Sequence, residues 1–277
     1  MAWQTIVRRL IPLSLRQEIK HHWRQLHDRA HGIHFDKHKN VIHSAQPIQL
    51  TQPIMPGAFY ENKMTNIYRG SSLINHTMLA PNCYWSFWQQ VHRPSSANGF
   101  VTGRNLVNGE LIAQLGGGLC QLSSLIYHLA LLAGLTIIER HAHSVDIYEE
   151  HQRFTALGAD ATVVWGFKDL RLYNPHAFVV SFQFVVQNGE LQGAVYAEDE
   201  LSAQHVVFAR LPLEKPFIQI NTLVNNTFIP LQFIIKNKVW ESHPLHNTFL
   251  LAKIYIAAYL VYKHKSHKKD SKQREQK

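Results

Sequence analysis

A run of three glycines directly before an apolar helix is the feature that most restricts how this chain can fold. Residues 116–121 read Gly-Gly-Gly-Leu-Cys-Gln, and glycine permits backbone conformations that other residues rarely adopt. The residues that follow repeat at helical spacing: Leu122, Leu125, Ile126, Leu129 and Leu132. Gly134 is placed to end that helix. The sequence therefore predicts a tight turn into an amphipathic helix, whose apolar face must pack on another layer.

Strand patterns dominate the chain after this helix. Alternating or β-branched segments occupy residues 136–138, 161–165, 170–173, 178–186 and 191–196, and further strands are expected across 205–240. Asn188-Gly189 is typical of a type I′ hairpin turn. Helices followed by a run of strands favour an α+β fold with a mainly antiparallel sheet. We expect the 121–133 helix to pack on the sheet formed by 136–196.

The N-terminal half predicts two further helices separated by a loop. Residues 14–31 form a basic helix with Ser14 as its N-cap, and Leu15, Ile19, Trp23 and Leu26 recur at helical spacing. The prolines of 45–58 indicate a loop or linker. A second helix is expected over 64–79. The aromatic run 84–88 is interpreted as core, with substrate stacking as the alternative, and 92–118 as turns with at most short strands.

The charge balance points to an anionic neighbour. Lys and Arg number 28 against 19 Asp and Glu, and 19 His add latent positive charge. Much of the excess lies in 264–277, which should be a solvated tail. We expect a weak association of the 14–31 helix and this tail with an anionic membrane surface. Nucleic acid is not expected, because no nucleic-acid-binding motif accompanies the charge.

The sequence carries no pattern that predicts export or membrane insertion. Its first 25 residues contain basic residues on both sides of a very short apolar stretch, unlike a secretory signal. The longest apolar run, 249–262, is too short to span a bilayer, which needs roughly 20 residues. We therefore expect a cytoplasmic protein, peripheral at most to the inner membrane face.

Neither a metal nor another cofactor is expected. A histidine-rich stretch contains His27, His31, His34 and His38, and this spacing could bring imidazoles together on one helix face. Gly32 interrupts that helix, and no carboxylate or thiol pattern completes a recognisable metal site. A solvated basic face is the preferred interpretation. The two cysteines, Cys83 and Cys120, lie in separate local environments and are interpreted as free thiols.

Cys120 is the candidate nucleophile. It falls near the N-terminus of the predicted helix, where free N–H groups and the helix dipole stabilise a thiolate. A base and an orienting acid are available downstream, with His141 and His143 in the 140–144 segment and Asp160 at the start of a predicted strand. The alternative is that Cys120 is a small, inert residue of the core.

Several motifs resemble the VanW family. GGGLCQLSSLIYHLALLAGL, then IIERHAHS, then GADATVVWGFKDLRLYN are similar to the family's central pattern. Upstream, LAPNCYWSFWQQV resembles another family segment, with Asn82 in place of the usual glycine. The resemblance covers about residues 64–200. It implies a VanW-like domain at 46–240 between a basic helical extension at 1–45 and a C-terminal helix with a basic tail at 241–277.

The resemblance also implies roles for individual residues. It implies Cys120 as nucleophile, His143 as base in preference to His141, and Asp160 as the orienting acid. A substrate-binding set would comprise Gly116, Gly117, Gly118, Gln121, Ser123 and Arg140, with the arginine binding a carboxylate.

The family further implies a link to peptidoglycan and glycopeptide resistance. The expected activity is a cysteine acyl transferase, similar in role to L,D-transpeptidases, that acts on a peptidoglycan peptide or precursor. The alternative is a non-catalytic accessory protein that holds an anionic or peptide ligand with the glycine-rich loop.

Overall fold

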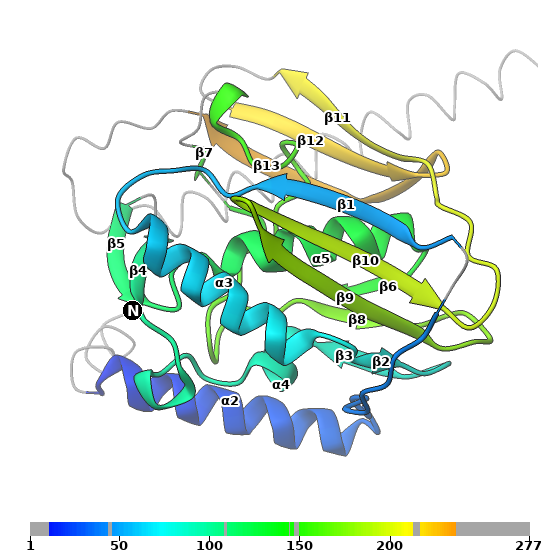
Figure 1. Cartoon of the computed structure of the whole chain (residues 1–277), viewed down its shortest axis with the longest axis horizontal. Helices are drawn as coiled ribbons and strands as arrows, with labels where there is room; N and C mark the ends of the chain where they lie inside the picture. Colours follow the sequence, from blue (N-terminus) through cyan, green and yellow to red (C-terminus); the bar gives the residue numbers. More distant parts are fainter. Residues whose placement is uncertain are drawn as a thin grey trace, which may run out of the picture. The chain divides into compact units, whose positions relative to one another are not determined.

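A computed structural model describes residues 11–43, 46–107, 110–143, 145–146, 150–212 and 217–236. The chain divides into two units, Met1–Lys238 and Val239–Lys277. The second unit, and with it the helix and tail predicted at 241–277, lies outside the described residues. The first unit combines helices with mainly antiparallel sheets, so the predicted α+β class is confirmed (Figure 1).

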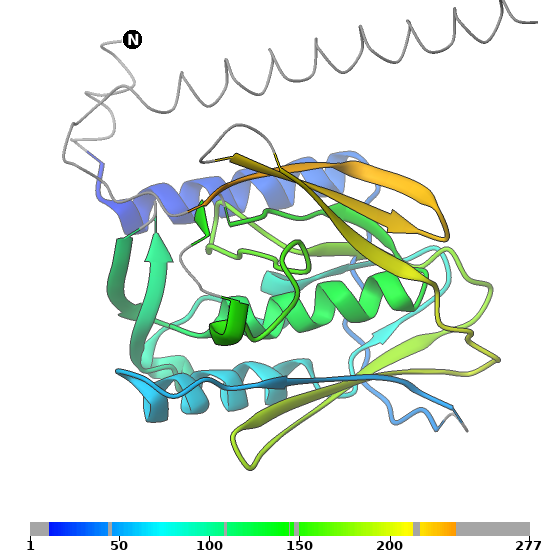
Figure 2. The same cartoon turned by 90° about the horizontal axis from the view of Figure 1, so that it is seen from above.

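Helix α5 (Leu119–Leu132) is the centre of the first unit. It begins after Gly118, whose φ is 107°, and ends at Ala133, which Gly134 follows with a φ of 67°. Its apolar side chains are fully buried: Leu122, Leu125, Ile126 and Leu129. Figure 2 shows α5 running between two sheets, with β9 and β10 on one side and β11 to β13 on the other. The amphipathic helix predicted after the glycine run is therefore confirmed.

One antiparallel sheet has the order β1-β10-β9-β2. Its strands are β1 (Ile48–Pro53), β10 (Glu190–Ala197), β9 (Val180–Gln187) and β2 (Met78–Leu79). Asn188 and Gly189 join β9 to β10 with positive φ angles of 53° and 74°, as a type I′ turn requires. The sheet lies close to α5 at Gly193, where an added Cβ would lie 2.8 Å from Leu125 and 2.9 Å from Leu129.

The remaining strands form three further sheets. β3 (Tyr84–Ser86), β8 (Arg171–Tyr173) and β6 (Thr136–Glu139) make an antiparallel sheet of order β3-β8-β6. β4 (Thr102–Val107) and β5 (Glu110–Leu115) form a hairpin. The last sheet has the order β11-β12-β13-β7, and its strands are β11 (Val206–Pro212), β12 (Phe217–Val224), β13 (Thr227–Lys236) and β7 (Val145–Asp146), which pairs in parallel with β13.

The predicted single sheet over 136–196 is therefore wrong in detail. β6 and β8 pair with each other and β3, whereas β9 and β10 pair with β1 and β2. The loop predicted over 45–58 contains strand β1, which tolerates its one proline because β1 is an edge strand and Pro53 is its last residue.

The other helices surround this framework. α2 (Leu13–Ala30) follows Pro12 and has no side-chain cap, so Ser14 is not its N-cap as predicted. α3 (Tyr60–Ile74) starts and ends earlier than predicted, because Met78 and Leu79 leave the helix to pair with β9. α4 (Phe87–Val91) follows β3, and two short 3-10 turns lie at Ser96–Asn98 and Glu150–Gln152. Among the described helices, none combines the length and apolar character that a bilayer crossing requires.

The aromatic run and the cysteines follow the predictions. Trp85 and Phe87 are fully buried, which confirms the run as core. Cys83 and Cys120 are both free thiols.

Truncation of the α5 core should cost far more stability than the same kind of change on a sheet surface. Leu125 is fully buried against Gly193, so Leu125→Ala should lower the free energy of unfolding by about 2–5 kcal/mol. Val185 lies on β9 with its side chain exposed, and Val185→Ala should change the free energy of unfolding by no more than about 0.5 kcal/mol. Urea denaturation of both variants measures the difference, and equal losses would contradict the central packing of α5.

Candidate active site

The glycine turn fixes where α5 begins and therefore where Cys120 lies. A Cβ on Gly117 would lie 2.2 Å from the carbonyl carbon of Gly103 in β4, so only glycine allows this approach of two backbones. Asn66 of α3 is fully buried and donates from Nδ2 to the carbonyl oxygens of Gly117 and Val101, each at 2.9 Å. These two hydrogen bonds tie the glycine turn and the residue before β4 to α3. Cys120 follows in the first turn of α5 and is partly exposed.

Two serine hydroxyls of α5 hold the neighbouring loop against the first turn of the helix. Ser123 Oγ donates to the Ala161 carbonyl at 2.6 Å, and Ser124 Oγ accepts from the Ala161 amide at 2.9 Å while it donates to the Cys120 carbonyl at 2.6 Å. The Cys120 thiol in turn donates to the Val163 carbonyl at 3.8 Å. Residues 161–165 are therefore a loop held by a helix and not the predicted strand.

This loop brings Asp160 to His143. The carboxylate oxygen Oδ2 of Asp160 lies 2.8 Å from His143 Nδ1 and accepts from the His143 backbone amide at 2.6 Å. The imidazole also interacts with the thiol of Cys120, which lowers the pKa of the thiol and raises that of the ring. Because Nδ1 is engaged by Asp160, Nε2 is the ring nitrogen that remains for the sulfur. Cys120, His143 and Asp160 thus form one connected series of side chains.

Arg140 orients the carboxylate of this series. Its Nη2 donates to Asp160 Oδ1 at 3.1 Å and to the Gly158 carbonyl at 2.8 Å, and its Nε donates to the Asp160 carbonyl at 2.7 Å. The guanidinium carbon lies 4.6 Å from the centre of the Tyr127 ring. The predicted role of Arg140 in binding a substrate carboxylate stays a prediction. In the structure the guanidinium contacts the site's own aspartate.

The electrostatics favour a thiolate paired with an imidazolium. Although burial alone lowers the pKa of His143, its hydrogen bonds to Asp160 and Cys120 raise it to about 10. Burial raises the pKa of Cys120, but the hydrogen bond and positive charge of His143 outweigh it and hold that pKa below its usual value. The pKa of Asp160 also lies below its usual range. Burial alone would raise this pKa, but the hydrogen bonds and positive charges of His143 and Arg140 lower it by more. His143 and Asp160 are therefore both charged at neutral pH, and their charges favour ionisation of the Cys120 thiol.

The side chains of the site are partly buried. The side chains of His143 and Asp160 retain 21% and 13% of their exposure, and Cys120 is intermediate between buried and exposed. Cys120 also packs against the main hydrophobic core, so its interpretation as a small, inert core residue stays the alternative.

The other predicted residues divide into those near the series and those engaged elsewhere. His141 pairs with Glu139, its Nε2 lying 2.9 Å from Oε1. Gln121 donates to the Pro53 carbonyl at 2.9 Å, while its buried Oε1 has no hydrogen-bond partner within the described part of the chain. Gly116 and Gly118 adopt positive φ angles of 79° and 107°, and a Cβ on either would meet Pro94 or Lys63. These positions shape the turn, and their predicted substrate contacts stay predictions.

Sequence reasoning missed the residues that position the series. Ser124, Asn66 and Tyr127 bind or support it, but none lies in a pattern that indicates chemistry. Ser124 alone carried a usable signal, because it lies four residues after Cys120 and so above it on the same helix face.

Comparison with known proteins finds a family match over the part of the chain that contains these residues. The family model described as "VanW like protein" matches residues 62–196. Vancomycin B-type resistance protein VanW of Enterococcus faecalis is 28% identical over 149 residues, which are 54% of this chain and 54% of that protein. The uncharacterized protein YoaR of Bacillus subtilis is 27% identical over 156 residues, 56% of this chain and 50% of that protein. The matches thus span about half the length of these relatives. No solved structure matches the chain.

The charge pairing predicts an unusual pH dependence of thiol alkylation. The rate at which iodoacetamide alkylates Cys120 should fall less steeply from pH 8 to pH 6 than that of an ordinary thiol, because the protonated His143 lowers the pKa of Cys120. Cys83 is the internal control, since burial and Asp36 raise its pKa and its rate should fall nearly tenfold per pH unit. Peptide mass spectrometry measures both rates. A Cys120 profile parallel to that of Cys83 would refute the ion pair.

Removal of the Asp160 charge should shift that profile to higher pH. Asp160→Asn keeps the side chain's size but removes the charge that raises the pKa of His143, so the Cys120 thiolate loses its partner at a lower pH. Asp199→Asn, a change of the same kind at an exposed turn, should leave the profile unchanged. Circular dichroism verifies that both variants fold. An unaltered profile in folded Asp160→Asn would mean that Asp160 does not set the state of His143.

Proposed function

This chain is a VanW-like family protein, and from that premise we propose that it is a cysteine-dependent acyl transferase acting on peptidoglycan-type peptides. The observation that carries the proposal is the connected series of Cys120, His143 and Asp160 at the start of α5. A nucleophile, a base and an acid that orients the base are the three groups that thiol acyl transfer requires. The substrate class rests on the family and on the vancomycin-resistance name of one relative.

The groups fit a two-step reaction. The Cys120 thiolate attacks the carbonyl carbon of an amide and forms a C–S bond. The His143 imidazolium gives its proton to the departing amine as the C–N bond breaks. An acceptor amine or water then returns a proton to His143 and attacks the thioester, which releases the thiolate. The acyl group is transferred without any oxidant or reductant.

The position of the thiolate supports the first step. Cys120 lies in the first turn of a fourteen-residue helix, where the dipole and the N–H groups favour negative charge on the sulfur and on a tetrahedral intermediate. Asp160 holds the imidazole through Nδ1, which keeps Nε2 directed at the sulfur and stabilises the protonated ring. Arg140 donates one hydrogen bond to the carboxylate and two to the backbone carbonyls of Asp160 and Gly158, and is a positioning residue.

Formation of an acyl-enzyme tests the proposal directly. The protein incubated with peptidoglycan-derived peptides should gain the mass of the acyl fragment on Cys120, as detected by intact-protein and peptide mass spectrometry. Cys120→Ala should abolish the adduct, and His143→Ala should slow its formation by at least about 100-fold, the usual scale of general acid–base catalysis.

Two matched variants serve as controls. Cys83→Ala removes the other free thiol, and His141→Ala removes an imidazole two residues away that pairs with Glu139, so both should form the adduct at close to the normal rate. Peptide that binds equally to the unaltered protein and to Cys120→Ala, with no adduct in either, would favour the non-catalytic accessory role and refute the transferase.

A further inference from the structure

Helix α2 turns its apolar stripe away from the protein. Leu15, Ile19, Trp23 and Leu26 recur every three or four residues and so lie on one side of the helix. Their relative exposures are 50%, 54%, 55% and 63%. An amphipathic helix on a globular domain normally buries this side. The usual orientation is therefore reversed.

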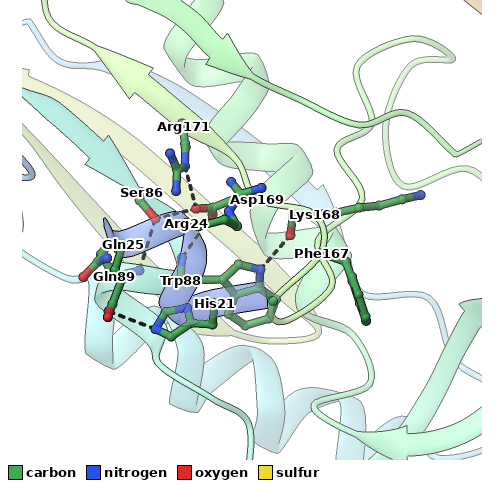
Figure 3. Close-up of a pocket in the computed structure, with 11 residues that line it drawn as sticks. His21, Arg24, Gln25, Ser86, Trp88, Gln89, Phe167, Lys168, Asp169 and Arg171 are labelled. Carbon is green, nitrogen blue, oxygen red and sulfur yellow. Dashed lines mark hydrogen bonds and ion pairs between the residues drawn. The ribbon is translucent and has the colours of Figure 1, made fainter. Parts of the chain in front are cut away.

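The opposite, polar side of α2 attaches the helix to the domain. Asp28 is buried and accepts two hydrogen bonds from Arg171 of β8, at 2.8 and 3.0 Å, and Arg24 pairs with Glu139 of β6. The ring of His21 stacks on that of Trp165 with 4.1 Å between the centres. Figure 3 shows His21 and Arg24 facing the domain beside Trp88, Asp169 and Arg171.

These contacts fix the rotation of the helix about its axis. Burial of a charge is costly unless the charge stays paired, so rolling α2 to bury its apolar stripe would leave Asp28 and Arg171 without each other. The backbones also meet closely, since a Cβ on Gly166 would lie 2.4 Å from the carbonyl oxygen of Gln17. The outward stripe is thus a property of the folded protein.

The outward side of α2 also carries basic flanks. Lys20 and Arg29 are exposed on either side of the stripe, and Lys20 Nζ lies 4.7 Å from the centre of the Trp23 ring. The helix has only two acidic residues: Asp28 pairs with Arg171, and Glu18 accepts hydrogen bonds from Arg93 and Trp165. An apolar stripe with tryptophan, cationic edges and no acid is the composition of a helix that lies in a membrane interface.

We propose that α2 docks this protein on an anionic lipid bilayer, with its axis in the plane of the surface and its stripe in the headgroup region. Lipid is favoured over a second copy of the chain, because two such faces would bring the cationic flanks of Lys20 and Arg29 against each other. α2 does not qualify as a membrane-spanning helix, so it would lie on the bilayer and not cross it. The inference is independent of the proposed acyl transfer.

Vesicle sedimentation of the full chain tests this docking. The protein should sediment with vesicles that contain phosphatidylglycerol and much less with phosphatidylcholine alone. The double variant Ile19→Ser, Leu26→Ser should lose at least about tenfold in partition coefficient, since it removes apolar surface from the stripe. Lys20→Gln and Arg29→Gln should each lower binding to the anionic vesicles by about fivefold, the effect of one basic residue near such a surface.

A matched double variant separates the stripe from general surface apolarity. Val185→Ser, Val207→Ser changes two exposed valines on β9 and β11 and should bind as the unaltered protein does. The proposal would be overturned if the unaltered protein did not bind the anionic vesicles. It would also be overturned if the Ile19→Ser, Leu26→Ser variant bound fully, because another segment would then be responsible for binding. Analytical ultracentrifugation tests the competing partner. If the unaltered protein is a dimer and the Ile19→Ser, Leu26→Ser variant is a monomer, the stripe binds a second copy of the chain and the proposal is overturned.

Discussion

The approach of the Gly117 backbone to Gly103 fixes where α5 begins, and the candidate site depends on that point. Any side chain at Gly117 would displace β4, and the buried amide of Asn66 holds the same turn from α3. With the start of the helix fixed, Ser123 and Ser124 lie one turn after Cys120 and hold Ala161 by hydrogen bonds. Asp160 precedes that residue directly, so its carboxylate is brought to His143 by the helix itself.

The hydrogen bonds that this arrangement gives to Asp160 explain why ionised groups can persist in a half-buried site. The Asp160 carboxylate accepts hydrogen bonds from the His143 ring, the His143 amide and the Arg140 guanidinium, which together compensate its negative charge. A carboxylate held in this way favours a protonated imidazole, and a protonated imidazole favours the Cys120 thiolate. Each charge in the series is stabilised by its neighbour, and loss of the aspartate would be felt at the sulfur.

The sequence predicted the parts of the site that local patterns encode. The glycine run and the leucine spacing predicted α5 and the tight turn before it, and the family resemblance singled out His143 and Asp160. The predicted strand at 161–165 was wrong, because alternation reports a half-buried segment but not its partner: here the partner is a pair of serine hydroxyls. Strand β1 was missed because the prolines in and around it indicate a loop. A proline is compatible with a strand at the edge of a sheet, but the sequence does not show that β1 is an edge strand.

The orientation of α2 could not be predicted from its own residues, because it depends on Arg171, which lies 143 positions away from Asp28 in the sequence. In the resulting arrangement, one loop, residues 163–168, contacts both the candidate site and α2. The Val163 carbonyl accepts from the Cys120 thiol, the Trp165 ring stacks on His21, and Gly166 contacts the backbone of Gln17. The hydrogen bonds between Val164 and Lys168 close this loop into a tight turn. α2 and the Cys120 side chain therefore contact the same short turn, α2 through His21 and Gln17 and the thiol through the Val163 carbonyl.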